Sequence, residues 1–229
     1  MILGDCDDRF LVFLPGFLIS PDAYRGLLTR IAGADLTVVV PRLYRVGPSV
    51  MLGRFTADDE AQRAVEVVRD RCGADARMWL AGHSRGGQAA WLAARLLAEQ
   101  GLVVDGLILV DPVDGAGPRS NEPHATKAPV QFEHRPLIIG AGLGGKCAPA
   151  AVNHDQFARA ADPSWHVVVQ DMGHADMLTG RALSLGRRLC GGGSDPDSSR
   201  AAIQSMVEDY LAGRIDSTWL PPSGVAWAR

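Results

Sequence analysis

The chain has 229 residues, of which 47% are hydrophobic and 21% charged, and this composition excludes a disordered or fibrous protein. Its length suits one large domain, and two small domains are the alternative. The formal net charge of −3 and the lack of a run of five basic residues give no electrostatic reason to expect nucleic acid or an anionic membrane surface as a partner.

The N-terminal segment gives no sign of export. Residues 1–8 carry three aspartates and no basic side chain, unlike a secretory signal. The apolar residues 10–19 are too few to span a bilayer, and they include Pro15 and Gly16. We therefore expect a cytoplasmic protein with no transmembrane segment and with its cysteines as thiols. A disulfide between Cys147 and Cys190 is the alternative.

Strands and helices are predicted to alternate along the whole chain. Apolar runs typical of strands buried on both faces occupy residues 10–14, 36–40, 78–81, 107–110, 137–139 and 166–170. Apolar residues at helical spacing predict helices over residues 20–31, 56–72, 85–100, 153–160 and 199–211. This alternation predicts an α/β fold in one domain of residues 1–229, with a mostly parallel central sheet and helices on both faces.

Two segments show neither the apolar runs of buried strands nor apolar residues at helical spacing. Residues 115–135 are rich in Pro, Gly and His, and connections of this length in a compact domain are usually functional or disordered. We predict that they form a lid over the functional site. Residues 214–229 form a tail that contains Trp219 and Trp227.

A serine motif follows the third predicted strand. Gly82, Ser84 and Gly86 fit the pattern Gly-x-Ser-x-Gly, which in the α/β-hydrolase fold is a sharp strand-to-helix turn that exposes the serine hydroxyl. Here an apolar run leads in and a helical pattern leads out, as the motif requires. We predict that Ser84 is a nucleophile; a chance glycine-rich turn is the alternative reading.

A serine nucleophile needs a histidine base, and six histidines compete for the role. His174 follows the last predicted strand in a loop, where the base of this fold belongs. The others lie in a strand, in the predicted lid or next to the serine itself. His154 is the remaining rival, and we predict that His174 is the base.

The histidine in turn needs an acid that fixes its tautomer. Asp111 ends the predicted strand that follows Ser84, whereas the glycine-rich loop after residue 139 offers no carboxylate. We predict Asp111 as the acid, with Asp114 as the next candidate and Asp155 or Asp176 after it. A turn residue at the Asp-Pro corner is the structural alternative for Asp111.

Acyl transfer also needs donors for the oxyanion. The backbone N–H groups of Arg85, next to the nucleophile, and of Phe17, after an early strand, are the candidates. Residues predicted to line a substrate pocket, or else to be simple core residues, are Phe13, Leu18, Ile19 and Asp114, together with the Phe17 ring. We expect no metal and no cofactor.

These motifs together resemble the chlorophyllase family, α/β-hydrolases that cleave the phytyl ester of chlorophyll. The similar segments, in order, are Pro15-Gly16-Phe17, Pro41-Arg42-Leu43-Tyr44, Gly82-His83-Ser84-Arg85-Gly86-Gly87, Asp111-Pro112-Val113-Asp114-Gly115, Gly142-Leu143-Gly144, Cys147-Ala148-Pro149, Val152-Asn153-His154 and Gly173-His174-Ala175-Asp176-Met177-Leu178. The resemblance implies Ser84 as nucleophile, Asp111 as acid and His174 as base, without a cofactor. Pro15 departs from the family, which commonly has a histidine there.

We therefore expect a serine ester hydrolase acting on a small-molecule ester with an apolar portion, not on nucleic acid. One alternative keeps the triad but uses an amine or hydroxyl acceptor, as in an acyltransferase, thioesterase or cyclase, with the lid excluding water. Another is a non-catalytic binding protein on the same fold, with the tryptophan-containing tail as its contact surface.

Overall fold

The computed structural model describes residues 1–44, 56–71, 76–102, 104–115, 124–127, 132, 134–145 and 147–228. Within these residues an eight-stranded sheet has the order β1-β3-β2-β4-β5-β6-β7-β8. Six strands run parallel: β2 (Arg9–Leu14), β3 (Thr37–Val39), β4 (Arg77–His83), β5 (Gly106–Val110), β6 (Leu137–Leu143) and β7 (Trp165–Gly173). They correspond to the six predicted strands. The fold prediction, a mostly parallel sheet with helices, is confirmed.

Two short antiparallel strands at the sheet edges were not predicted. β1 (Ile2–Leu3) pairs with β3, and β8 (Val225–Trp227) pairs with β7. Strand β8 brings the C-terminal tail onto the domain, where Trp219 and Trp227 stack edge to face with ring centroids 5.5 Å apart. The tail is therefore partly used in packing, which weakens the reading of it as a free contact surface.

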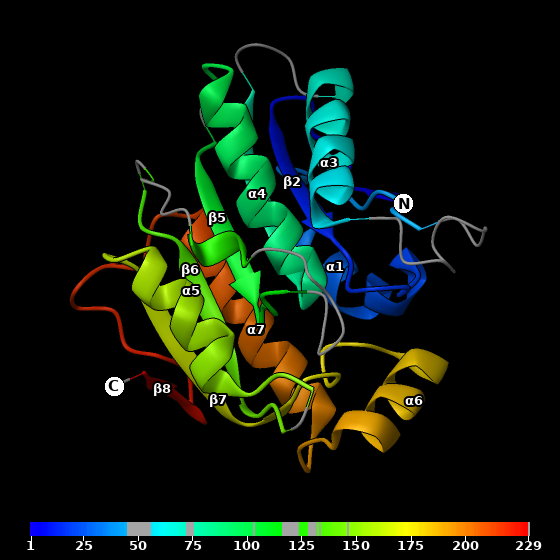
Figure 1. The fold of residues 1–229 in the computed structure, drawn as a ribbon, viewed down its shortest axis with the longest axis vertical. Helices are drawn as coiled ribbons and strands as arrows, with labels where there is room; N and C mark the ends of the chain where they lie inside the picture. The colour runs from blue at the N-terminus through cyan, green and yellow to red at the C-terminus, as the bar shows by residue number, and fades with distance from the viewer. Residues whose placement is uncertain are drawn as a thin grey trace.

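Helices cover both faces of the sheet (Figure 1). On one face lie α1 (Arg25–Ile31), which continues the 3₁₀ turn η1 (Pro21–Tyr24), and α7 (Pro196–Leu211). On the other lie α3 (Ala57–Arg71), α4 (Arg85–Glu99) and α5 (His154–Ala160). Successive residues of β2 alternate between the two cores, because side chains of a strand point to opposite faces in turn.

Helix α6 (Gly180–Cys190) was not predicted, and none of its residues is buried. It lies at one end of the molecule, apart from the two helix layers (Figure 1). Helix α7 begins three residues before the predicted Ser199, because the Asp195 side chain accepts hydrogen bonds from the N–H groups of Asp197 and Ser198 and so caps the helix there.

Cys147 and Cys190 form a disulfide that joins the loop after β6 to the end of α6. The expectation of thiols is therefore wrong for this pair; Cys6 is free, and Cys72 lies outside the described residues. The predicted cytoplasmic location stays a prediction, and the disulfide counts against it because disulfides persist in oxidising compartments. In the described part of the chain no helix is long and apolar enough to cross a membrane.

Candidate active site

The turn between β4 and α4 carries Ser84 in an uncommon backbone conformation, with φ 56° and ψ −128°. A non-glycine residue with positive φ is strained and is held only by its surroundings. Glycines allow the turn to close: a Cβ at Gly82 would collide with the backbone of Gly86, and a Cβ at Gly86 with the backbone of Leu14. The carbonyl of Ser84 accepts hydrogen bonds from the N–H groups of Gly87 and Val113. The Gly-x-Ser-x-Gly pattern thus fixes where the hydroxyl stands.

Three side chains from separate strand ends meet at this turn. The Ser84 hydroxyl lies 3.0 Å from His174 Nε2, and His174 Nδ1 lies 2.6 Å from Asp111 Oδ2. The hydrogen-bond pattern is consistent when the hydroxyl donates to Nε2 and Nδ1–H donates to the carboxylate. The structure therefore brings together the predicted nucleophile, base and acid.

Asp111 is held firmly at the end of β5. It is fully buried, and its N–H donates to the Ile139 carbonyl at 2.6 Å. Its second carboxylate oxygen, Oδ1, accepts from the Ala141 N–H at 3.0 Å. One oxygen is thus occupied by the backbone of the neighbouring strand, and the other faces His174.

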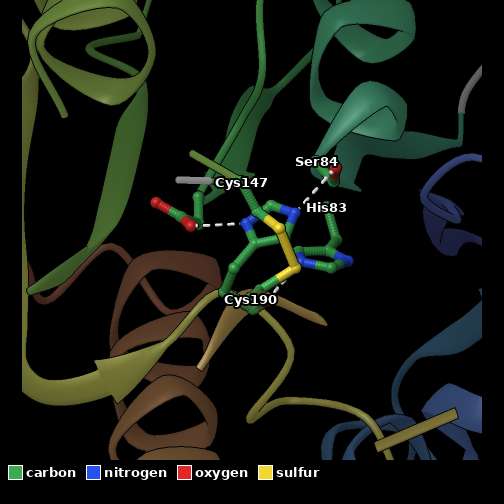
Figure 2. Close-up of a disulfide and its surroundings, with 6 residues drawn as sticks. His83, Ser84, Cys147 and Cys190 are labelled. Carbon is green, nitrogen blue, oxygen red and sulfur yellow. Dashed lines mark hydrogen bonds and ion pairs between the residues drawn. A yellow bond between two sulfur atoms is a disulfide. The ribbon is translucent and has the colours of Figure 1, made fainter. Parts of the chain in front are cut away.

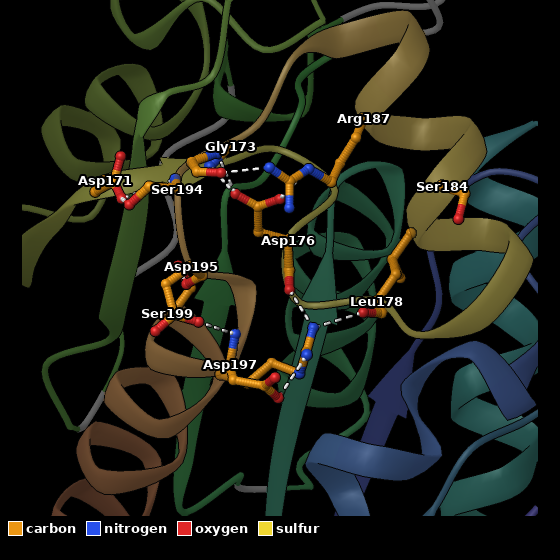
Figure 3. A network of polar contacts seen from close by, with 12 residues as sticks. Asp171, Gly173, Asp176, Leu178, Ser184, Arg187, Ser194, Asp195, Asp197 and Ser199 are labelled. Atoms are coloured by element: carbon orange, nitrogen blue, oxygen red, sulfur yellow. Dashed lines mark hydrogen bonds and ion pairs between the residues drawn. The ribbon is translucent and has the colours of Figure 1, made fainter.

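Asp176, which is fully buried, stabilises the loop that carries His174 through a network of polar contacts (Figure 3). Asp176 Oδ2 accepts from the N–H groups of Gly173 and Gly193, and Oδ1 lies 3.6 Å from the Arg187 guanidinium. Arg200 donates to the backbone carbonyls of Asp176 and Leu178. Asp176, which was a remaining candidate for the acid, therefore shapes the loop, and the carboxylate that faces His174 Nδ1 belongs to Asp111.

A second buried chain of hydrogen bonds connects the three loops of the site. The Tyr24 hydroxyl accepts from the Gly16 N–H at 2.8 Å and lies 2.9 Å from His83 Nδ1. His83 Nε2 lies 2.9 Å from the His174 carbonyl oxygen. Since the carbonyl can only accept, Nε2 carries the proton and the Tyr24 hydroxyl donates to Nδ1.

Both groups in this chain keep those roles because of burial. Burial, followed by the neighbouring His174, holds the pKa of His83 well below its ordinary value, so the ring stays neutral. Burial also raises the pKa of Tyr24, so the hydroxyl stays a donor. Tyr24 and His83 were not predicted; the sequence places Tyr24 among the apolar residues of a helix, and its hydroxyl role depends on tertiary contacts.

We expect Tyr24→Phe to lower kcat by roughly tenfold with little change in KM, because the Gly16 and His174 backbone positions lose a shared anchor. Tyr210→Phe is the matched control. The Tyr210 hydroxyl also accepts from a backbone N–H, that of Leu107, and donates to a carbonyl, but it lies at the opposite end of β5 from Asp111. Ester hydrolysis and thermal unfolding of both variants would be measured. If both variants lose the same share of kcat, the effect of Tyr24→Phe comes from reduced stability of the protein and not from the active site.

The two backbone N–H groups predicted to bind the oxyanion belong to Arg85 and Phe17, which come from different parts of the chain. Arg85 is the first residue of α4, and Phe17 follows Gly16 in the loop after β2. The Gly16 N–H is committed to Tyr24, whereas no acceptor for the Phe17 N–H is found among the residues described. The Arg85 side chain forms a buried ion pair with Glu60 at 2.6 Å and also lies over the Phe17 ring, at 5.5 Å. These contacts fix the loop and the helix start relative to each other.

A cavity of about 680 Å³ opens beside Ser84 and His174. Leu18 and Ile19, two of the residues expected at a substrate pocket, contribute to one wall, and so does Phe17. The opposite wall comes from the unpredicted helix α6, through residues such as Leu185 and Leu189. A volume of this size and a mostly apolar wall are typical of small-molecule sites.

Two predicted pocket residues do not line this cavity. Phe13 points into the core between the sheet and α1, with its ring 5.0 Å from that of Tyr24. Asp114 is buried elsewhere, because its carboxylate accepts from the N–H groups of Ala125 and Thr126 and so caps the short turn η2 (Ala125–Lys127). The predicted lid over residues 115–135 lies mostly outside the described residues and stays a prediction.

The disulfide lies close to the reactive groups. Cys190 lines the same cavity as Ser84 and His83, and Figure 2 shows the sulfur–sulfur bond beside them. It fastens the last residue of α6 to the loop after β6 and so holds one wall of the cavity.

His154, the rival base, belongs to another cluster. Its Nδ1 lies 2.9 Å from His166 Nε2 and 3.1 Å from Asp155 Oδ1, and these residue types could hold a metal ion. Burial, then His154, lowers the pKa of His166 to about 4; the Asp155 carboxylate acts in the opposite direction, and Arg159 lowers the pKa slightly further.

Comparison with known proteins places this site in a family. The sequence profile of the chlorophyllase family matches residues 9–217. Chlorophyllase-2 of Arabidopsis thaliana is 28% identical over 244 residues, which cover 92% of this chain and 74% of that protein. Chlorophyllase type 0 of Chenopodium album is 33% identical over 196 residues, covering 76% of this chain and 56% of that protein. A structure from work on the metagenome-derived lipolytic enzymes LipS and LipT is 27% identical, with a TM-score of 0.37 over 47% of this chain and 44% of that chain.

The fold, the serine on its strand-to-helix turn and these relatives define a serine hydrolase that acts on carboxylic esters. More particularly, the chain belongs to the chlorophyllase family, because the family profile matches most of its length. The resemblance seen in the sequence motifs is confirmed.

Proposed function

We propose that this protein hydrolyses a carboxylic ester with a bulky apolar portion, of the kind found in the phytyl ester of chlorophyll, through a Ser84-His174-Asp111 triad. The observation that carries the proposal is the pair of contacts at 3.0 Å and 2.6 Å that join the three side chains at the edge of an apolar cavity. The names of the relatives, which are chlorophyllases, support the substrate class.

In the proposed acylation step, Ser84 Oγ attacks the ester carbonyl carbon while His174 Nε2 takes the hydroxyl proton. Negative charge develops on the carbonyl oxygen, where the N–H groups of Phe17 and Arg85 are the proposed donors. Nε2–H then protonates the departing alcohol oxygen as the ester C–O bond breaks. The acyl group remains on Ser84.

Deacylation reverses the proton transfers. A water molecule attacks the acyl carbon, His174 takes one of its protons, and the Ser84 oxygen leaves with that proton, which releases the acid. Asp111 keeps the Nδ1–H of His174 in place throughout and stabilises the imidazolium that forms. No step in this sequence calls for a metal or a cofactor.

The test is incubation of the purified protein with chlorophyll a beside a panel of simple esters, with products identified by mass. We expect chlorophyllide and phytol in equal amounts, and no product with Ser84→Ala. Cleavage of simple esters without chlorophyllide would overturn the pigment substrate and leave the hydrolase assignment standing. Transfer of the acyl group to an added amine or alcohol in preference to water would instead favour an acyltransferase.

A further inference from the structure

The mouth of the active-site cavity is unusually apolar for an exposed surface. Leu185 and Leu189 of α6 are 59% and 70% exposed, and Phe17 and Leu18 on the opposite side are 47% and 52% exposed. All four line the same cavity as Ser84. Large apolar side chains gathered at one exposed place, in contrast to scattered ones, indicate a contact surface.

Helix α6 does not use these leucines to hold itself in place. Its inner side makes the contacts: Leu183 packs partly against the core, Gly186 lies against Ala175, and Arg187 binds Asp176 and the Gly193 carbonyl. Its outer side, with Leu185 and Leu189, is free of packing contacts with the core. The fold therefore maintains an amphipathic helix whose outer apolar side chains contribute nothing to the hydrophobic core.

The charge on this helix is of one sign. The α6 sequence contains three arginines and no carboxylate. Arg181 and Arg188 are exposed, and within the described ranges neither forms an ion pair. They lie four residues before and three residues after Leu185, so all three share one side of the helix. At the cavity, the described carboxylate on this rim is Asp22, which pairs with Arg25 at 2.7 Å.

We propose that α6 and the Phe17–Leu18 turn dock on a lipid surface that carries anionic headgroups, with the cavity mouth facing the lipid. Arginines that flank exposed leucines are typical of helices that lie in a membrane interface, because the leucines enter the acyl region and the guanidinium groups reach the headgroups. A second copy of the chain fits less well, since two such helices face to face would bring four unpaired arginines together.

The proposal explains how an apolar ester could reach Ser84, and it rests on the proposed function only for the identity of that ester. The net charge of −3 for the whole chain gave no reason to expect an anionic surface as a partner. The attraction is local: a positive helix next to an apolar rim is enough for surface binding, because headgroup attraction acts within about 8 Å at physiological salt.

Co-sedimentation with vesicles tests the docking without catalysis, since all proteins would carry Ser84→Ala. Vesicles of phosphatidylcholine alone are compared with vesicles that contain phosphatidylglycerol. We expect tighter binding to the anionic vesicles, by on the order of thirtyfold for two arginines at low salt, and loss of that preference in Arg181→Gln with Arg188→Gln. Leu185→Ser with Leu189→Ser should weaken binding to both kinds of vesicle by at least about tenfold.

Leu220→Ser is the matched control, because Leu220 is 83% exposed in the tail and does not line the cavity. It should bind vesicles as the parent does. Equal binding by the parent and the α6 variants, all with unchanged thermal unfolding, would overturn the proposal. So would dimerisation of the parent in light scattering that the leucine variants abolish, because the surface would then be an interface between copies. Failure to cleave chlorophyll would leave the vesicle result untouched.

Discussion

Ser84→Ala is expected to abolish ester hydrolysis, with kcat lower by on the order of 10⁴-fold or more and little change in the thermal unfolding temperature. The hydroxyl is the group that faces His174 Nε2 at 3.0 Å, and removing it leaves no attacking oxygen on the protein. The fold should survive, because the turn is fixed by backbone hydrogen bonds of Ser84 and not by its side chain. Kinetics with a short p-nitrophenyl ester would measure the loss.

Labelling by a fluorophosphonate probe gives a second, independent readout of the same residue. The parent protein should be labelled on Ser84 and the variant should not, while Ser217→Ala, which changes an exposed serine of the tail, should be labelled normally. Unchanged labelling of Ser84→Ala would show that another nucleophile reacts, and the proposed triad would have to be abandoned.

Five of the six parallel strands could be predicted because they are almost entirely buried and therefore appear as continuous apolar runs. The sixth strand, β7, is partly exposed, and its three consecutive valines revealed it. Helix α6 was not predicted, because it shows no comparable buried apolar pattern. None of its residues is buried, and Gly186 in its middle is unfavourable in a helix interior, so its few leucines did not stand out as a core-facing helix. Strand β8 has only three residues, and its pairing with β7 depends on tertiary context that no short pattern encodes.

In the site, too, some residues could be predicted from local sequence pattern, and others depend on tertiary contacts. Ser84, Asp111 and His174 each follow a strand that ends at one edge of the sheet, so topology alone brings them near one another. Tyr24 and Asp176 act through hydrogen bonds to backbone groups of other loops, and side-chain type says nothing about such partners. The Cys147–Cys190 disulfide closes a separation of 43 residues, which spacing alone could not decide.

The sharpest test of the acid is Asp111→Asn, which we expect to lower kcat by about 10⁴-fold while the protein stays folded. Asp111 Oδ1 accepts from the Ala141 N–H, so the carbonyl oxygen of an asparagine would take that position and its NH₂ group would face His174 Nδ1. His174 would then have to accept at Nδ1 and carry its proton on Nε2. In that tautomer the imidazole cannot take the proton of Ser84.

Asp114→Asn is the contrasting variant, because Asp114 was the alternative acid and is equally buried from solvent. Its carboxylate accepts from two backbone N–H groups and from the Thr126 hydroxyl, and none of these contacts involves His174. We expect a lower unfolding temperature but a kcat within about tenfold of the parent, since one of these acceptors is lost without any change at the imidazole. A larger loss of kcat in Asp114→Asn than in Asp111→Asn would show that Asp114, and not Asp111, is the acid of the triad. Nitrogen chemical shifts of His174, which report the tautomer directly, would show whether the imidazole has changed in each case.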